Sequence, residues 1–349
     1  MRSDEGDWAQ RLDVVVVNHN SGASLAGCVD SLNVAGVQHV VIVDNDSSDD
    51  SLARLTLPAK VRAAAPTPDP PVMVIQVAAN IGYGAGANRG IAASVAEMVM
   101  VCNPDLVVHP GAPAALVAAL DADPSLGIVG PLVLQPDGKR YPSARRFPSL
   151  VDAAGHGLLG FVAPDNRFSR RYRLDELDRT TQASGSSEGP ALAVPSGSPV
   201  RDSQGRQAVA VDWVSGSCFA ARRSMLEELG GFDESYFMYA EDVDLCSRAH
   251  QAGWGVGYLA TAVVTHAQGV STSRRPYRML AEHHRSLMRY AVRSTRGWRR
   301  LLLPGVAAGL GTRLAIASAR HAVAAKRTPG VGRVADRVGR GSARGSQSG

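Results

Sequence analysis

Three carboxylates follow an aromatic run in the segment 231–248. The run contains Tyr236, Phe237 and Tyr239, and the acids Glu241, Asp242 and Asp244 come directly after it. Apolar residues among and after these acids predict a helix that begins here and ends near residue 253. Free backbone N–H groups and the dipole at a helix N-terminus stabilise carboxylates, so a plain acidic cap would explain them. The aromatic side chains favour a second explanation, a site that binds a ring and removes a proton.

Four short apolar runs predict the strands that would position these acids. They cover residues 13–17, 40–43, 72–77 and 98–102, and loops and helical patterns separate them. This alternation predicts an α/β fold with a doubly wound, mostly parallel central sheet that is Rossmann-like, and ligands at the carboxyl ends of its strands. Asp44 follows the second strand and is well placed there for a ribose or a base.

A glycine-rich block runs from Asn80 to Gly90, and we expect the helix after it to extend through Glu97. Glycines let the backbone approach a ligand closely, and a helix N-terminus favours an anion. The block has three explanations: a dinucleotide fingerprint, a plain turn, or a loop that packs on a nucleotide diphosphate. Because the fingerprint belongs after the first strand of a βαβ unit and this block follows the third, we favour the diphosphate loop.

Further polar residues stand at the ends of predicted strands. Asp105 follows the fourth strand, where a carboxylate can hold a divalent cation and, through it, phosphate oxygens. The sequence Asn-Pro-Asp is also ordinary turn chemistry. His266 ends a predicted strand over 256–265 and is either a structural histidine or a ligand. Trp213, near the end of a predicted strand over 208–214, belongs either to a sugar-binding surface or to the core.

The remaining part of the predicted globular region carries less chemistry. We expect a helix over 112–120, a strand over 127–134, a hairpin turn at 136–138 and a helix over 148–159. Residues 183–202 are rich in Ser, Gly, Pro and Ala without periodicity. They predict a flexible insertion that has no chemical role.

The composition is that of a globular protein with a basic C-terminal part. The 349 residues are 45% hydrophobic and 20% charged, which are ordinary globular values. Residues 283–349 carry 14 basic and one acidic residue, whereas residues 1–282 carry 23 basic and 31 acidic residues. Such a basic part calls for an acidic partner, either nucleic acid or an anionic membrane surface. The four cysteines lie in apolar runs without C-x-x-C spacing and predict reduced, buried thiols of a cytoplasmic protein.

The C-terminal part predicts helices at a membrane surface. We expect a helix over 276–293 and a helical stretch over 298–325 in which Ala and Leu alternate with arginines. This pattern favours helices that lie on anionic lipid, and an ordinary basic surface helix is the alternative. We expect no transmembrane helix, because no uninterrupted run of 18 apolar residues is present. The polar N-terminus predicts no signal peptide, and residues 328–349 predict a disordered basic tail.

Six blocks, taken in order, resemble the family 2 glycosyltransferases, which have a GT-A fold. Four are short: Val-Val-Asn-His-Asn at 16–20, Val-Asp-Asn-Asp-Ser at 43–47, Asn-Pro-Asp at 103–105 and Trp-Val-Ser-Gly at 213–216. The other two are the glycine block at 80–90 and Phe-Met-Tyr-Ala-Glu-Asp-Val-Asp-Leu-Cys-Ser-Arg at 237–248. The likeness covers about residues 13–271, interrupted by the insertion. The two longer blocks look most like the rhamnosyltransferase branch.

The resemblance implies a role for each matching residue. Asp242, with Glu241 beside it, takes the place of the base that deprotonates the acceptor hydroxyl. Asp105 takes the last position of the family's Asp-x-Asp metal motif, and His266 would be a second contact to Mg²⁺ or Mn²⁺. Asn103 replaces the first Asp of that motif. The acceptor side would be lined by Trp213, Gly216 and Tyr239. The nucleotide sugar would be held by Asn18, Asp44, Asn45, Asn80, Gly82, Gly84, Gly86, Asn88 and Asn103.

The resemblance also implies substrates and a location. The expected reaction is an inverting transfer of L-rhamnose from dTDP-rhamnose to N-acetylglucosamine carried on polyprenyl diphosphate. This step builds the cell-wall linker between arabinogalactan and peptidoglycan. The enzyme would be a peripheral protein on the cytoplasmic face of the plasma membrane and would bind no nucleic acid; a homo-oligomer stays open. The GT-A domain would span residues 1–275, and the membrane-associating helices 276–327.

Three alternatives stay open at this level. The same fold could use another donor, such as UDP-galactofuranose or UDP-glucose. A non-catalytic nucleotide-sugar-binding or RNA-binding protein would use the basic tail, although the intact pair Glu241 and Asp242 argues against it. A nicotinamide oxidoreductase is the remaining enzyme class.

Overall fold

The computed structural model describes residues 7–55, 72–147, 200–201, 207–267 and 276–327. The helix expected over 148–159, the tail 328–349 and most of the insertion expected over 183–202 lie outside the described residues. The end of that insertion was assigned incorrectly. Val200–Arg201 form strand β9, which pairs antiparallel with β10 (Gln207–Ala210).

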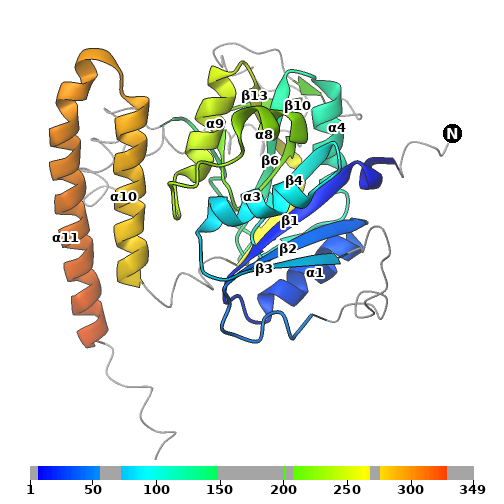
Figure 1. Cartoon of the computed structure of the whole chain (residues 1–349), viewed down its shortest axis with the longest axis horizontal. Helices are drawn as coiled ribbons and strands as arrows, with labels where there is room; N and C mark the ends of the chain where they lie inside the picture. The colour runs from blue at the N-terminus through cyan, green and yellow to red at the C-terminus, as the bar shows by residue number, and fades with distance from the viewer. Residues whose placement is uncertain (1–6, 56–71, 148–199, 202–206, 268–275, 328–349) are drawn as a thin grey trace, which may run out of the picture.

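One mixed sheet is the centre of the fold (Figure 1). In the described residues its strand order is β3-β2-β1-β4-β12-β6-β13-β10-β9, with β5 paired to β13 and β7 to β6. Neighbours from β3 to β4 are parallel, as are β6 and β13, whereas β12 runs antiparallel between β4 and β6. The predicted doubly wound, mostly parallel sheet is therefore confirmed. Its other strands are β1 (Leu12–Asn18), β2 (His39–Asn45), β3 (Val72–Val77), β4 (Met98–Cys102), β5 (Leu106–Val108), β6 (Leu126–Leu134), β7 (Arg140–Tyr141), β12 (Cys218–Arg222) and β13 (Gly255–His266).

Helices cover both faces of this sheet because its central strands are apolar on both sides. In β1, Val14 and Val16 pack into one core, together with residues of α1 and α4. Val15 and Val17 point to the opposite face, as strand alternation requires, and pack with residues of α3, α8 and α9. The helices are α1 (Ser24–Val34), α3 (Tyr83–Ala93), α4 (Ala112–Ala122), α8 (Arg223–Leu229) and α9 (Glu241–Gln251). A short η1 helix (Asp7–Gln10) precedes β1.

Two predicted elements have different bounds in the structure. The helix after the glycine block ends at Ala93 rather than at Glu97, because the N–H groups of Val95 and Ala96 bond to the side chain of Asp13 at 2.9 and 3.1 Å. The strand expected over 208–214 is two strands. β10 ends at Ala210, and Trp213–Val214 form β11 in a separate two-stranded sheet with β8 (Ala144–Arg145).

Most of the glycine block is the helix α3 itself, which packs unusually close to the sheet. A Cβ on Gly90 would lie 2.3 Å from Val15 Cγ1, and one on Gly86 would lie 2.9 Å from Val17 Cγ1. These glycines therefore bring helix and sheet together and do not form a diphosphate-binding loop. The expectation of such a loop was wrong for this part of the block.

The close packing of α3 predicts that Gly90→Ala lowers the free energy of unfolding. Its Cβ would overlap Val15, a buried residue in a central strand, and overpacking of this kind costs about 1–3 kcal/mol. Urea denaturation measures the loss. Gly27→Ala on α1 is the matched control, since its Cβ would meet nothing within 4 Å and alanine favours a helix. A Gly90→Ala protein as stable as Gly27→Ala would contradict the packing argument.

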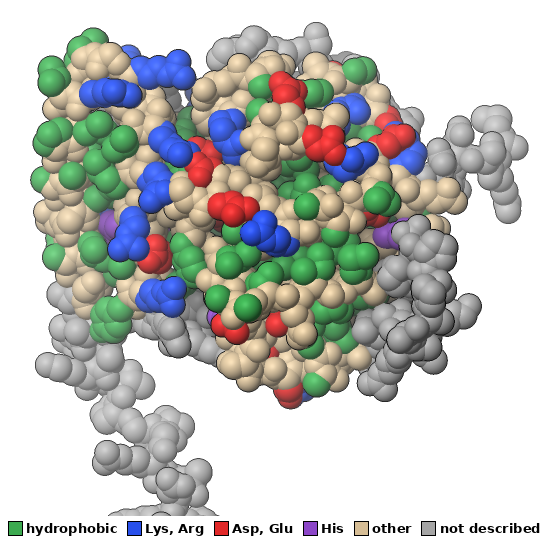
Figure 2. All heavy atoms as spheres, viewed as in Figure 1, with side chains coloured by type: hydrophobic (Ala, Val, Ile, Leu, Met, Phe, Trp, Pro, Cys, Tyr) green, Lys and Arg blue, Asp and Glu red, His purple; other side chains and the backbone are tan. Residues whose placement is uncertain are grey.

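The C-terminal helices form a hairpin beside the globular part (Figure 1). α10 (Pro276–Ser294) packs against α11 (Leu303–Arg327), and η3 (Gly297–Leu302) lies in the connection. Figure 2 shows apolar side chains gathered on the outer side of this hairpin and basic side chains along its boundary with the globular part. The exposed apolar residues there include Trp298, Leu301, Leu302 and Ile316.

The segment Gly297–Ser318 is long and apolar enough to cross a membrane, with a mean hydropathy of 1.4. The sequence-based expectation that no segment has this character does not hold. Arg313 interrupts the apolar run of residues 301–318 without making that run polar on average.

Candidate active site

The ends of β1 and β2 bring two of the predicted nucleotide-binding residues together. Asn18 lies opposite Asp44 in the parallel register, and its Nδ2 donates a hydrogen bond of 2.7 Å to Asp44 Oδ1. The same amide nitrogen lies 2.9 Å from Ser51 Oγ and 3.1 Å from Ser47 Oγ, and Asn18 is fully buried. Asn18 therefore orients the carboxylate of Asp44 and the loop that follows it.

Asn45 holds the start of the glycine block. Its Nδ2 donates to the carbonyl of Gly82 at 2.9 Å and to Asn80 Oδ1 at 3.2 Å, and its Oδ1 accepts from the N–H of Ile81 at 3.0 Å. Gly82 has a φ of 95°, and a Cβ there would lie 2.4 Å from the carbonyl oxygen of Phe237. The block and the aromatic run are thus in backbone contact, which only glycine permits at this position.

Asp105 and His266 face each other across the sheet edge. β5 pairs antiparallel with the end of β13, so His266 lies opposite Leu106, the residue after Asp105. The Asp105 Oδ1 and His266 Nε2 atoms are 2.9 Å apart, and Asn103 Nδ2 lies 3.3 Å from the same nitrogen. The structure therefore brings together the three residues that the resemblance assigned to the cation and the diphosphate.

The helix α9 begins at the predicted catalytic acids. Tyr239 and Ala240 have φ values of 69° and 62°, a left-handed conformation that costs a non-glycine residue roughly 1–2 kcal/mol. This sharp bend turns the first residues of α9 toward the sheet. Asp242 Oδ2 accepts a hydrogen bond of 2.8 Å from the N–H of Gly216, and Asp242 Oδ1 accepts one of 2.8 Å from the N–H of Val243.

The turn 215–217 joins the two halves of the site. At its centre, Gly216 donates to Asp242, and its carbonyl accepts a hydrogen bond of 2.6 Å from the hydroxyl of Tyr83. At its end, the carbonyl of Ser217 accepts a hydrogen bond of 2.9 Å from the N–H of Asn103. The carboxylate of Asp242 is therefore fixed to the centre of this short turn, and Asn103, beside the pair of Asp105 and His266, is fixed to its end.

Burial raises the pKa of both adjacent acids, but their partners differ. Glu241 is only 6% exposed, and burial together with the charge of Asp242 raises its pKa to about 8. No described residue donates a hydrogen bond to Glu241 Oε2. Burial also raises the pKa of Asp242, but the hydrogen bonds from Gly216 and Val243 and the positive charge of Arg145 oppose this rise. Hydrogen bonds therefore stabilise the ionised form of Asp242, whereas burial favours the protonated form of Glu241.

The raised pKa of Glu241 predicts a pH-dependent stability. Between the pKa of an unfolded glutamate and the folded value of about 8, the folded state binds more protons, so stability falls as pH rises. The slope is at most about 1.4 kcal/mol per pH unit. Urea denaturation from pH 5 to 8 should show this slope reduced in Glu241→Gln and kept in Glu227→Gln, an exposed residue on α8. Equal slopes in wild type and Glu241→Gln would contradict a buried, protonated Glu241.

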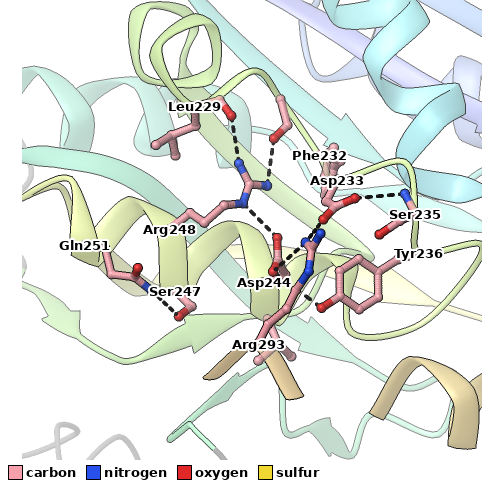
Figure 3. A network of polar contacts seen from close by, with 12 residues as sticks. Leu229, Phe232, Asp233, Ser235, Tyr236, Asp244, Ser247, Arg248, Gln251 and Arg293 are labelled. Atoms are coloured by element: carbon pink, nitrogen blue, oxygen red, sulfur yellow. Dashed lines mark hydrogen bonds and ion pairs between the residues drawn. The ribbon is translucent and has the colours of Figure 1, made fainter. Parts of the chain in front are cut away.

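A network on the other side of α9 fixes this helix to the preceding loop and to α10 (Figure 3). Asp244, whose side chain is 8% exposed, accepts a hydrogen bond of 2.7 Å from Arg248 Nε. The Arg248 guanidinium also donates to the carbonyls of Leu229 and Gly231 at 2.9 and 2.8 Å. Arg293 of α10 pairs with Asp233 and lies 3.8 Å from Asp244. Asp233 and Asp244 thus have structural roles, whereas Glu241 and Asp242 lie in the site.

Three predicted site residues have structural partners. Trp213 is 5% exposed, and its indole N–H donates to the carbonyl of Arg146 at 2.9 Å, so it is a core residue rather than an open sugar-binding surface. Asn88 bonds to both backbone groups of Phe232 and not toward Asp44. Gly84 faces Phe232, and a Cβ added to Gly84 would lie 2.9 Å from Phe232 Cβ. Tyr239, in contrast, lies next to the predicted catalytic acids, and its ring is in edge contact with His283.

The sequence did not indicate three residues that the structure places at this site. Tyr83, inside the glycine block, supports Gly216 through its hydroxyl. Arg145 lies over the rings of Tyr141 and Trp213, at 5.4 and 5.1 Å from their centroids. His283 comes from α10, more than 40 positions after Tyr239. Each of them meets the site through tertiary contacts, so no local pattern could have identified them.

Comparisons with known proteins identify the family of this chain. Residues 13–182 match the family described as Glycosyl transferase family 2, and residues 198–296 match the one described as Glycosyltransferase like family 2. The N-acetylglucosaminyl-diphospho-decaprenol L-rhamnosyltransferase of Mycobacterium tuberculosis is 36% identical over 300 residues, which are 82% of this chain and 86% of that protein. The low-salt glycan biosynthesis hexosyltransferase Agl10 of Haloferax volcanii is 25% identical over 75% of this chain and 69% of its own length.

Among solved structures, the mannosyltransferase PcManGT from Pyrobaculum calidifontis in complex with GDP-Man and Mn²⁺ aligns with a TM-score of 0.49 and 17% identity. The alignment covers 88% of this chain and 75% of that one. The mixed, mostly parallel sheet with helices on both faces is the GT-A arrangement that the sequence resemblance implied. The prediction of a glycosyltransferase, rather than a binding protein or an oxidoreductase, is confirmed by the family matches. This chain belongs to glycosyltransferase family 2.

Proposed function

We propose that this enzyme transfers L-rhamnose from dTDP-rhamnose to N-acetylglucosamine carried on polyprenyl diphosphate, with inversion at the anomeric carbon. The observation that carries the proposal is the 36% identity to the mycobacterial rhamnosyltransferase over 82% of the chain. The six blocks that resemble family 2, two of which look most like the rhamnosyltransferase branch, lie within the matched family regions. The implied pathway is the synthesis of the arabinogalactan–peptidoglycan linker.

In this proposal Asp242 removes the proton from the acceptor hydroxyl. Its carboxylate is held by two backbone N–H groups, which fix its direction without neutralising it. The hydroxyl oxygen then attacks the anomeric carbon, and the bond to the nucleotide diphosphate breaks on the opposite side. Because the acceptor oxygen attacks directly, no carboxylate has to act as nucleophile. Glu241 is also unsuited to that role, since it is buried and its pKa is raised to about 8. One base and a direct displacement give inversion.

On the donor side, we assign Asp44 to the nucleoside and Asn18 to the orientation of Asp44. Asn45 and Asn80 hold the loop 80–82 against the aromatic run, so they shape the donor side of the site through the backbone. Gly84, Gly86 and Asn88 support α3 and the loop before α9, as their contacts indicate. They therefore act on the donor indirectly.

The residues at the sheet edge fit a divalent cation, Mg²⁺ or Mn²⁺. Asp105 Oδ1 and His266 Nε2 point at each other at 2.9 Å, so a small movement would let both bind one ion. Two protein ligands suit a cation that also keeps waters and binds substrate phosphates. When bound, the ion would neutralise charge that develops on the departing diphosphate. Asn103, at the first position of the motif, offers an amide in place of a carboxylate. Among the described residues, no group of three or more His, Cys, Asp or Glu side chains could hold a metal ion.

We also propose that the hairpin of α10 and α11 attaches the enzyme to the cytoplasmic face of the plasma membrane. Trp298 and Leu301 are 71% and 81% exposed, and arginines flank them in the sequence. Apolar side chains with basic neighbours insert into the interface of an anionic bilayer. A lipid-linked acceptor requires this location.

This attachment predicts that Leu301→Glu weakens binding to phosphatidylglycerol vesicles. The substitution removes apolar contact and adds a charge that anionic lipid repels, so we expect a loss of about tenfold or more in vesicle affinity. Vesicle flotation measures it. Val34→Glu, at a residue that is 72% exposed on α1, is the matched control and should float as wild type does. Equal flotation of both variants would rule out η3 as the attachment.

The experiment that tests the function is a transfer assay with Mg²⁺ or Mn²⁺ and N-acetylglucosaminyl-diphospho-prenol as the acceptor. The enzyme is offered dTDP-rhamnose, UDP-glucose and UDP-galactofuranose in parallel. We expect transfer from dTDP-rhamnose and its loss on addition of a chelator. Transfer from a UDP-sugar alone would keep the fold and the base but replace the donor, which is the main alternative. The relative Agl10 is named a hexosyltransferase, so such donors are the appropriate comparison.

A further inference from the structure

Arg145 is a fixed positive charge beside the proposed base. It lies in β8 of the small two-stranded sheet, whose partner β11 leads directly into the turn that holds Asp242. The guanidinium lies between two rings, 5.1 Å from the centroid of Trp213 and 5.4 Å from that of Tyr141. Its Nε donates to the carbonyl of Pro142 at 2.7 Å, and its Nη2 to the hydroxyl of Tyr141 at 3.1 Å. These contacts hold the side chain in one place and keep its charge.

A second arginine reaches the same region from the C-terminal hairpin. In an antiparallel helical hairpin, two residues at equal distances from the connection lie beside each other. His283 is 11 residues before the end of α10, and Arg313 is 10 residues after the start of α11, so the two lie at nearly the same height. Arg313 is half-buried, as are Val306, Leu310 and Ala317. This spacing of three and four residues defines the face of α11 that packs on α10. An arginine therefore interrupts the inner face of the hairpin at the level of His283.

His283 connects this arginine to the active site. Its ring is in edge contact with the ring of Tyr239 at 5.1 Å, two residues before Glu241. Burial, the neighbouring His284 and then the charges of Arg313 and Arg145 lower the pKa of His283 to about 4. Both arginines are thus close enough to act on one histidine, which stays neutral near pH 7. The charge of Arg145 also acts to lower the pKa of Asp242.

We infer that Arg145 and Arg313 bind the diphosphate of the lipid-linked acceptor, with the prenyl chain leaving along the α10–α11 hairpin. The inference rests on the proposed function and adds a binding site to it. In the acceptor, the diphosphate is attached to the anomeric carbon of the sugar, so it lies one sugar ring away from the hydroxyl that Asp242 deprotonates. Arginine is the side chain best suited to phosphate oxygens, because its planar group donates two parallel hydrogen bonds.

The proposed acceptor-diphosphate site, which we call the cradle and which consists of Arg145 and Arg313, lies apart from the residues assigned to the diphosphate of the donor. The pair of Asp105 and His266 is joined to one end of the turn 215–217 through Asn103. Arg145 is joined to the other end through β11, where Ser215 donates to the carbonyl of Ser143 at 2.7 Å. The two diphosphates would therefore lie on opposite sides of Asp242.

The test is a binding measurement that does not depend on transfer. Farnesyl diphosphate is titrated into the full-length enzyme saturated with dTDP, which blocks the donor site, and farnesol is titrated in parallel. We expect wild type to bind farnesyl diphosphate, and Arg145→Gln and Arg313→Gln to bind it about 10- to 100-fold more weakly, the range for hydrogen bonds to charged groups. Arg145→Lys keeps the charge and should recover part of the affinity. Arg285→Gln, an exposed residue of α10 paired with Glu282, is the matched control and should bind as wild type does.

Other outcomes would overturn the inference. Wild type that binds farnesol as well as farnesyl diphosphate, or arginine variants with unchanged affinity, would show that no diphosphate is held there. A parallel loss of dTDP affinity in Arg145→Gln would assign this arginine to the donor or to the general structure of the site. Equal losses of binding to phosphatidylglycerol vesicles would assign Arg313 to membrane phosphates.

A kinetic comparison separates this site from the proposed function itself. N-acetylglucosamine is offered either on prenyl diphosphate or as a neutral alkyl glycoside. We expect both arginine variants to show a 10- to 100-fold higher KM for the diphosphate acceptor, with the KM for the nucleotide sugar unchanged. Arg313→Gln should also keep the wild-type kinetics on the neutral acceptor, whereas Arg145→Gln also removes a positive charge that acts on Asp242. Wild type that transfers no sugar to either acceptor would contradict the proposed function, whereas the binding measurement would still decide whether the cradle exists.

Discussion

Replacing Asp242 by Asn should lower kcat for sugar transfer by about 10²- to 10⁴-fold, the usual contribution of a positioned general base. The amide has nearly the shape of the carboxylate and keeps one oxygen for the N–H of Gly216, but it cannot take the proton of the acceptor hydroxyl. Since Asp242 does not contact Asp44 or the loop 80–82, the affinity for dTDP should stay near the wild-type value. Steady-state kinetics and dTDP titration together check both expectations.

The control for this variant is Asp30→Asn, at an exposed position of α1 far from the turn 215–217. It makes the same chemical change and should leave kcat unaltered. Asp242→Asn with nearly normal turnover would remove Asp242 as the base and would direct attention to Glu241. Loss of dTDP binding in Asp242→Asn would mean that the hydrogen bond to Gly216 supports the fold of the site rather than the chemistry.

Replacing Asp105 by Asn should lower transfer by about 10²-fold or more, because the cation would lose its only carboxylate ligand among the described residues of the sheet edge. The direct readout is Mn²⁺ affinity, measured by calorimetry in the presence of dTDP. Loss of a charged ligand raises the Kd for a divalent ion, and a higher Mn²⁺ concentration should restore part of the activity. His266 would keep its place, since backbone pairing of β5 and β13 fixes it.

The matched variant is Asp137→Asn in the hairpin turn after β6, where the carboxylate is exposed and pairs with Lys139. This change should alter neither Mn²⁺ affinity nor turnover. If Asp105→Asn binds Mn²⁺ as wild type does, the cation is held elsewhere or is not required. Asn103 at the first position of the motif would then be a sign that this enzyme does not depend on the metal.

Much of the architecture was determined by local sequence. The runs at 13–17, 40–43, 72–77 and 98–102 are strands β1 to β4 with bounds within two residues of those predicted. They could be predicted because a strand buried on both faces must be apolar throughout, whatever its neighbours are. The acids at 241–244 begin a helix for an equally local reason, since free N–H groups and the helix dipole favour carboxylates there.

Local pattern was insufficient where one residue type serves two purposes. Gly84, Gly86 and Gly90 have the spacing of a ligand-binding loop, but close packing of α3 requires them: Gly86 and Gly90 against Val17 and Val15, and Gly84 against Phe232. The small residues next to Trp213 in the sequence are typical of a sugar-binding surface, but its indole N–H donates a hydrogen bond to the carbonyl of Arg146. Neither contact partner is near these residues in the sequence, so only the folded chain decides between the two purposes.

The division between sequence and tertiary structure is clearest at Asp242. The sequence alone determined that Asp242 follows an aromatic run at a helix start and matches the base of a known family. Tertiary structure decided its surroundings: its carboxylate accepts a hydrogen bond from the N–H of Gly216, 26 positions earlier, and the charge of Arg145, almost a hundred positions earlier, acts on its pKa. Burial and these distant charges set the pKa of a carboxylate, and a linear pattern does not contain them. The sequence therefore determined the type and position of the proposed catalytic group, whereas the fold determined its pKa and its surroundings.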